Sequence, residues 1–153
     1  MTTMPENREE LLQYYRTTRA DLLAAIDGLS DDVLSAPSLD GWSVANHFAH
    51  IAFWDDIRSS EVQRISAGHA TAWRMTDEHD DQLNDMAHEL RRDLSLEQSR
   101  WELSTSRQRL LHAISSATDR GMDPSLYGEA GLHTDHEAEH TDWINRWRKE
   151  NGL

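Results

Sequence analysis

The chain has 153 residues, a length typical of one domain with a substantial hydrophobic core. It carries 28 Asp and Glu residues against 15 Lys and Arg residues, so its formal net charge is −13. Nucleic acids and anionic membranes repel such a surface, and we expect neither as a partner. The chain has no cysteine, which excludes disulfides and thiolate ligands. With no secretory leader near Met1 and no long apolar run, we expect a single cytoplasmic domain over residues 1–153.

Apolar residues recur at helical spacing in four long segments, and almost no segment alternates as a strand would. The first predicted helix covers Pro5 to Ile26, and Ser30 caps a short turn after it. The second runs from Ser43 to about Ala67. The third follows Ser95, and the fourth covers residues 129–150. Loops with Gly and Pro at residues 36–41 and 119–128 separate these segments.

Residues 69–93 are the most polar stretch of the chain. Within them, Leu83, Met86 and Leu90 follow helical spacing, which predicts a thin surface helix over residues 77–92. The predicted fold is therefore all-α. It is a four-helix bundle with an additional short helix or loop region between the second and third long helices. Bundles of this kind build metal sites from side chains on facing helices.

The last predicted helix has histidines where a bundle helix normally has Leu or Ile. A 3-4-3-4 spacing, the spacing of a buried helix seam, relates five of its residues: His133, His136, His140, Trp143 and Trp147. Burying an imidazole without a partner is costly. A transition-metal ion is the simplest compensation, because imidazole is a common ligand for such ions.

The segment from His136 to His140 presents two imidazoles side by side, because residues i and i+4 share a helix face. It also reads as the HExxH sequence of zinc proteases, but only 13 residues follow it and none is a histidine. A third ligand is better placed on another helix. His50, about two turns into the second helix, is the best-placed imidazole. Three protein ligands leave one position for water or substrate, as in catalytic zinc sites.

Two further histidines lie near these positions. We expect His47 and His133 to support the ligands or to act as alternative ligands. Glu137 follows His136 directly, but its direction on the helix differs by about 100°, so we expect a solvated residue rather than a base. No catalytic residue is assigned.

The remaining aromatic and basic residues suggest two broader expectations. We expect core packing rather than substrate contact for Trp42, Trp54, Trp143 and Trp147. A basic patch could come from Arg100, Arg107 and Arg109.

The sequence resembles the DinB-like (YfiT-like) superfamily of metal-binding four-helix bundles. Trp42-Ser43 with His50 eight residues after the tryptophan resembles one family motif, and His136 with His140 resembles the other. The ending from His140 to Trp147 is most similar to the branch that contains the colibactin self-resistance protein. The resemblance implies His50, His136 and His140 as the metal triad, with zinc or nickel as the ion. Proteins of this superfamily are often dimeric, so a homodimer is expected.

The resemblance leaves several functions open. Some members use low-molecular-weight thiols such as bacillithiol or mycothiol, and others are hydrolases, isomerases or resistance proteins. We expect a metal-dependent small-molecule enzyme, with a thiol transferase as the first interpretation. A metal-dependent hydrolase or self-resistance protein is the first alternative. A non-catalytic protein that binds or sequesters a small molecule is the second.

Overall fold

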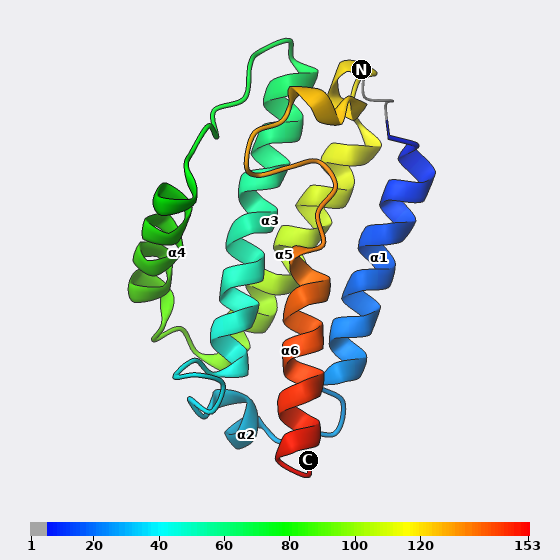
Figure 1. The fold of residues 1–153 in the computed structure, drawn as a ribbon. Coiled ribbons are helices and arrows are strands. Elements are labelled where there is room, and N and C mark those ends of the chain that lie inside the picture. The colour runs from blue at the N-terminus through cyan, green and yellow to red at the C-terminus, as the bar shows by residue number, and fades with distance from the viewer. Residues whose placement is uncertain (1–5) are drawn as a thin grey trace.

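The computed structural model describes residues 6–153 and shows an all-α bundle (Figure 1). Four long helices form the bundle, and a fifth helix, α4, lies outside it against α3. This arrangement confirms the predicted fold class, including the extra helix between the second and third long helices. The helices are α1 (Arg8–Ala25), α2 (Asp31–Ser35), α3 (Val44–Ser66), α4 (Asp77–Arg91), α5 (Leu96–Ser115) and α6 (His136–Glu150), with 3₁₀ turns η1 (Arg120–Met122) and η2 (Pro124–Leu126).

Side-chain caps explain where several helices begin. The hydroxyl of Ser43 accepts a hydrogen bond from the backbone N–H of Asn46, and the Asn46 side chain accepts one from the backbone N–H of Ser43. This capping box fixes the first turn of α3. Ser30 and Ser95 cap α2 and α5 through single hydrogen bonds. The predicted starts of these helices are confirmed because the cap residues are explicit in the sequence.

The predicted start of the last helix, at residue 129, is wrong: α6 begins at His136. Gly131 has φ of +64°, which interrupts a right-handed helix. Side chains from α1 and α3 also donate hydrogen bonds to carbonyl groups of this segment. Arg58 donates to the carbonyls of Ala130 and Gly131, and Tyr15 donates to that of Leu132. The segment is therefore an ordered loop held against the bundle.

Apart from a smaller apolar cluster around Trp54 and Ile57, a buried layer of charge divides the core into two apolar halves. One half joins α1, α3 and α5 around Leu11 and Leu110, and the other joins α1, α3, α5 and α6 around Phe48 and Ile144. Between them along each long helix lie Arg19, Asp55, Arg58, Arg107 and Glu137. We call these five residues the charged layer. They lie at the level where α6 begins.

Within residues 6–153, none of the helices combines the length and the apolar character needed to cross a lipid bilayer.

Candidate metal centre

Three histidines converge between α3 and α6. The Nε2 atom of His136 lies 2.9 Å from Nε2 of His50 and 3.1 Å from Nε2 of His140. One ligand atom from each residue lies within 4.8 Å of the others. Around a tetrahedral zinc ion with Zn–N bonds near 2.0 Å, two ligand nitrogens are about 3.3 Å apart. The observed spacings are close to that value, so these side chains fit a small divalent ion.

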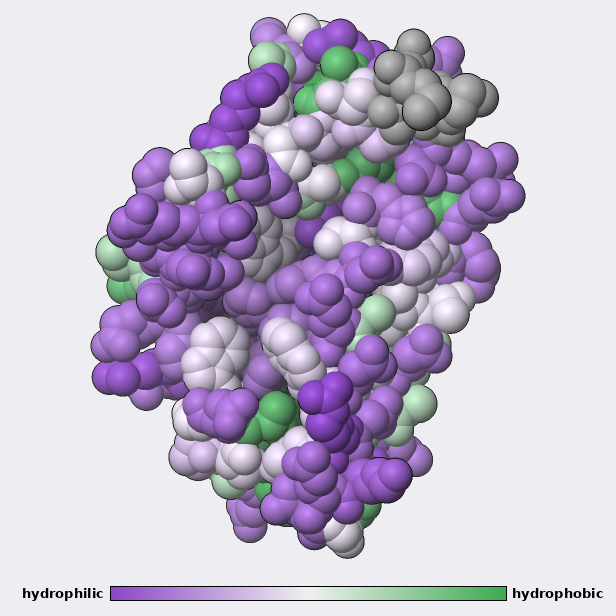
Figure 2. Space-filling model, in the orientation of Figure 1, coloured by the Kyte–Doolittle hydropathy of each residue, from purple (hydrophilic) through white to green (hydrophobic). Residues whose placement is uncertain are grey.

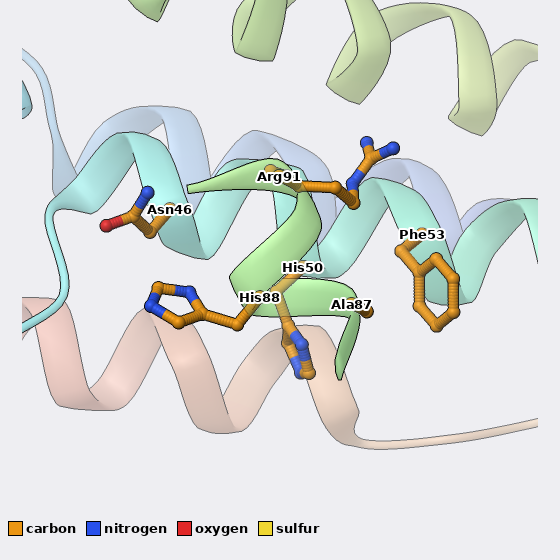
Figure 3. Close-up of a pocket in the computed structure, with 7 residues that line it drawn as sticks. Asn46, His50, Phe53, Ala87, His88 and Arg91 are labelled. Carbon is orange, nitrogen blue, oxygen red and sulfur yellow. The ribbon is translucent and has the colours of Figure 1, made fainter. Parts of the chain in front are cut away.

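Local helix geometry produces this convergence. His136 and His140 lie one turn apart at the start of α6, so their rings share one face. His50 lies about two turns after the Ser43 cap, on the face of α3 that meets α6. Figure 3 shows the His50 side chain pointing from α3 toward α6. The structure thus brings together the three residues that the sequence predicted as a triad.

Burial keeps these imidazoles neutral at physiological pH. Desolvation, with smaller contributions from neighbouring positive charges, lowers the pKa of His50 to about 4 and that of His136 to about 3. The pKa of His140 is also lowered, first by burial and then by the other histidines. A neutral imidazole is the form that binds a metal, so no proton needs to leave these side chains before ligation.

His47 contacts the opposite edge of the His140 ring. The two Nδ1 atoms lie 2.7 Å apart, so one of them must carry the shared hydrogen. If Nε2 of His140 binds an ion, its Nδ1 is protonated and donates to His47. His47 then carries its own hydrogen on Nε2, a buried atom without a hydrogen-bond partner among the described residues. His47 therefore orients the His140 ring, a contact of the kind that residues supporting metal ligands make.

His133 lies apart from the three-histidine cluster. It belongs to the loop before α6, so it does not share the helix face of His136 and His140. Its Nδ1 lies 3.1 Å from a carboxylate oxygen of Glu6, and its ring packs against Tyr14. This placement follows from the late start of α6, and it puts His133 beside α1 rather than among the converging Nε2 atoms.

An open pocket of about 800 Å³ borders the cluster. His47, His50, His136 and His140 line it together with residues from the turn before α3, from α4 and from the second half of α6. Figure 2 shows the corresponding face hollowed between α4 and α6, within a mainly hydrophilic surface. A small molecule can therefore approach the convergent nitrogens from solvent.

Two tryptophans that were expected in the core line this pocket instead. Trp42 is half-buried and Trp143 is 45% exposed, and both contribute to the pocket wall. The core expectation is confirmed for Trp54, which is 6% exposed. Trp147, which is 9% exposed, packs in the core with one edge on the pocket wall. The difference follows from position, because Trp143 projects from α6 toward the opening.

Sequence reasoning missed His88, which looked like one of several scattered surface histidines. It projects from α4 and stacks on Trp42, with ring centroids 4.1 Å apart and planes within 6° of parallel. Figure 3 shows His88 beside His50, where both line a second cavity of about 10 Å³ between α3 and α4. Only the packing of α4 against α3 reveals this contact. The other histidines outside the cluster and the last loop, His69, His79 and His112, are exposed.

The predicted solvated position of Glu137 is wrong. The side chain is 5% exposed, and its Oε1 accepts a hydrogen bond from Arg19 at 2.7 Å. Its other oxygen pairs with Arg107, which also pairs with Asp55. As predicted, consecutive positions on the helix send the side chains of His136 and Glu137 about 100° apart. The Glu137 side chain, however, points into the bundle rather than into water.

The three arginines of α5 do not form a basic patch at the pocket. Arg107 is buried in the charged layer, Arg109 pairs with Asp56, and Arg100 lies near Asp31. None of these arginines lines the pocket beside the histidines. Arg146 of α6 lines it, together with two acidic residues, Asp40 and Glu150.

Two comparisons with known proteins bear on this arrangement. A family model described as the DinB superfamily matches residues 13–144. A crystal structure titled as an uncharacterised protein from Escherichia coli UTI89 superposes with a TM-score of 0.77 at 17% identity, over 98% of this chain and 97% of that chain. At that identity, the likeness shows a shared fold. Among curated proteins, no match to this chain is found.

Proposed function

The chain belongs to the DinB superfamily, and we propose that it is a metal-dependent small-molecule enzyme. His50, His136 and His140 would hold one divalent transition-metal ion, zinc or nickel. The observation that carries this proposal is the convergence of three neutral Nε2 atoms beside an open pocket. Three imidazoles leave one position of a tetrahedral ion for an exchangeable ligand, which the pocket can supply.

The reaction that we favour is transfer of a low-molecular-weight thiol, of the bacillithiol or mycothiol type, to an electrophilic small molecule. When bound, the ion would lower the pKa of the thiol and so supply a thiolate at neutral pH. The chain has no cysteine, so the sulfur must arrive on a cosubstrate. The new carbon–sulfur bond forms as the leaving group departs with its electron pair. Arg146 is the cationic side chain of the pocket wall that can contact a cosubstrate carboxylate.

The position of Glu137 favours thiol transfer over hydrolysis. A metal-dependent hydrolase commonly uses a carboxylate near the metal-bound water as a base. Glu137, which follows His136, is paired with Arg19 and Arg107 within the bundle, and Asp135, which precedes His136, accepts a hydrogen bond from Tyr14. Hydrolysis or a self-resistance role remains the alternative, and simple binding of a small molecule is the third interpretation. The similarity of the ending from His140 to Trp147 supports the branch that contains the colibactin self-resistance protein.

The expected partners are small molecules, and neither nucleic acid nor membrane is expected, because the net charge of −13 disfavours both. We propose a cytoplasmic location, and we propose a homodimer because the superfamily resemblance implies one.

The first experiment is elemental analysis of protein purified without a nickel column, followed by assays with the metal-loaded protein. We expect about one ion per chain. When a panel of bacterial thiols is tested with 1-chloro-2,4-dinitrobenzene, we expect metal-dependent consumption of both the thiol and this electrophile. The His136→Ala variant should lose both properties. His112→Ala, which removes an exposed histidine from α5, is the matched control and should keep both.

Each outcome separates the interpretations. Consumption of the electrophile without consumption of thiol would support the hydrolase. An ion without turnover of either compound would support a binding protein. A His136→Ala variant that retains its ion with unchanged affinity would refute the three-histidine site.

A further inference from the structure

Two indole side chains flank the three-histidine cluster on the pocket side. The Trp42 ring centroid lies 5.4 Å from that of His50, and the Trp143 centroid lies 4.9 Å from that of His140. Both tryptophans also pack against His47, at 5.3 and 6.5 Å. The convergent nitrogens are therefore bordered by aromatic surface from α6 and from the turn before α3. We call Trp42 and Trp143 the aromatic pair.

Three contacts hold Trp42 in one orientation. Its backbone exchanges two hydrogen bonds with Leu39, at 2.9 and 3.0 Å, across a two-residue turn. Asp40 and Gly41 in that turn have φ of +52° and +88°, the sign that tight Asp-Gly hairpin turns require. His88 then covers one face of the indole by parallel stacking. A ring fixed before a ligand arrives loses little entropy when the ligand binds.

Trp143 has a different role in the fold from Trp147, the other tryptophan of α6. Trp147, one turn later, packs in the apolar core. Trp143 leaves 45% of its surface exposed and packs edge-on against His140. A large indole exposed at the wall of a pocket is typical of a ligand-binding surface, because aromatic rings bury much area with few rotatable bonds.

The charges of the pocket wall limit the ligand. Asp40 and Glu150 outnumber Arg146 among the charged residues that line it, and the whole chain is strongly acidic. A polyanionic substrate would therefore be repelled. Hydrophobic contact comes from Leu39, Trp147 and the aromatic pair. These properties suit a planar, uncharged or weakly charged ring system.

We propose that the aromatic pair binds the planar conjugated part of the substrate and so selects aromatic or extended conjugated electrophiles. This inference rests on the proposed function for the chemistry at the histidines. It assigns substrate selection to Trp42 and Trp143, with His88 as a positioning residue that holds the Trp42 ring.

The test uses 2-naphthol as a planar probe and decahydro-2-naphthol as its saturated counterpart. The chain has six tryptophans, so its indole N–H groups give six NMR signals that single variants can assign. We expect 2-naphthol to shift the signals of Trp42 and Trp143. The signal of Trp101, which is 60% exposed on α5, should not move. The saturated probe should bind at least tenfold more weakly.

Variants then measure the contribution of each ring. Trp143→Ala should weaken 2-naphthol binding about tenfold, and Trp143→Phe should restore most of it. Trp101→Ala is the matched control, because it removes an exposed indole that lies outside the pocket, and it should change nothing. His88→Ala should weaken binding less than Trp42→Leu does. Circular dichroism verifies that each variant keeps its helices.

Equal binding of 2-naphthol by the Trp143→Ala and Trp101→Ala variants would overturn the inference, as would equal binding of the two probes. The same titration with His136→Ala keeps this result distinct from the metal proposal. Binding of 2-naphthol that survives in that variant supports the aromatic pair whether or not thiol transfer occurs. Thiol transfer without selective binding of the planar probe would support the proposed function and refute the aromatic pair.

Discussion

Removal of the Glu137 side chain tests whether this residue supports the fold or acts in catalysis. In the charged layer, two carboxylates face three guanidinium groups, and all five side chains are buried or nearly so. Glu137→Ala would leave Arg19 and Arg107 without one of their two acidic partners. Asp55 alone would then balance three buried positive charges.

The size of the expected loss in folding stability follows from the burial of Glu137 and of its arginine partners. Arg107 and Glu137 each have only 5% of their side-chain surface exposed, so water cannot replace the lost carboxylate. Removing one partner of a buried ion pair typically destabilises a protein by about 3–5 kcal/mol. Against a total stability of about 5–15 kcal/mol, this is a large loss. For a domain of this size it lowers the melting temperature by about 10 °C.

Thermal unfolding of the metal-free protein, followed by circular dichroism, measures this effect apart from any metal. Glu139→Ala is the matched control, because Glu139 lies two residues later on α6 and is exposed. Its melting temperature should remain within about 1 °C of that of the original chain. If Glu137→Ala melts like Glu139→Ala, the ion pairs contribute no stability and the reasoning is refuted. A loss of activity without a loss of stability would instead identify Glu137 as a base.

Three other predictions concern the histidines. His140→Ala should abolish binding of one equivalent of zinc in calorimetry; unchanged affinity would place the site elsewhere. Chelation should lower the melting temperature while the helical signal persists at 25 °C, because the apolar core halves form without the ion; complete loss of helix would contradict this. Metal-free protein should lose stability as pH falls below 6.5, because burial lowers the pKa of both His47 and His50 to about 4 and the unfolded chain then binds more protons. The loss at pH 5 is about 2 kcal/mol for each of these residues, from about 1.4 kcal/mol per tenfold change in proton affinity, and flat stability between pH 7 and 5 would refute the prediction.

The helices were predictable because their signals are local. Ser43 and Ser95 cap helices whose apolar residues recur at helical spacing, and both helices begin within one residue of the predicted position. The predicted start of the fourth long helix was wrong because tertiary contacts decide that boundary. Arg58 and Tyr15, far away in sequence, capture carbonyl groups that a longer helix would have used itself.

The convergence of the three histidines was predictable from spacing and resemblance, but their surroundings were not. His47 contacts Nδ1 of His140 rather than its Nε2, a distinction that no sequence pattern carries. His88 reaches Trp42 only because α4 packs against α3. Burial of Glu137 depends on arginines from α1 and α5, and an isolated helix offers no sign of either partner.

The first turn of α6 connects the fold to the proposed chemistry. His136 and Glu137 are consecutive, so their side chains leave the helix about 100° apart. One direction leads to the convergent nitrogens and the pocket, and the other leads to Arg19 and Arg107. The side chain of Asp135 does not cap this helix start, and the ion pairs of Glu137, together with the Tyr14 hydroxyl that donates to Thr134 and Asp135, hold the turn against the bundle. Because His140 follows one turn later on the same helix, fixing that turn also fixes two of the three nitrogens. The charged layer within the core therefore helps to align His136 and His140 beside the pocket.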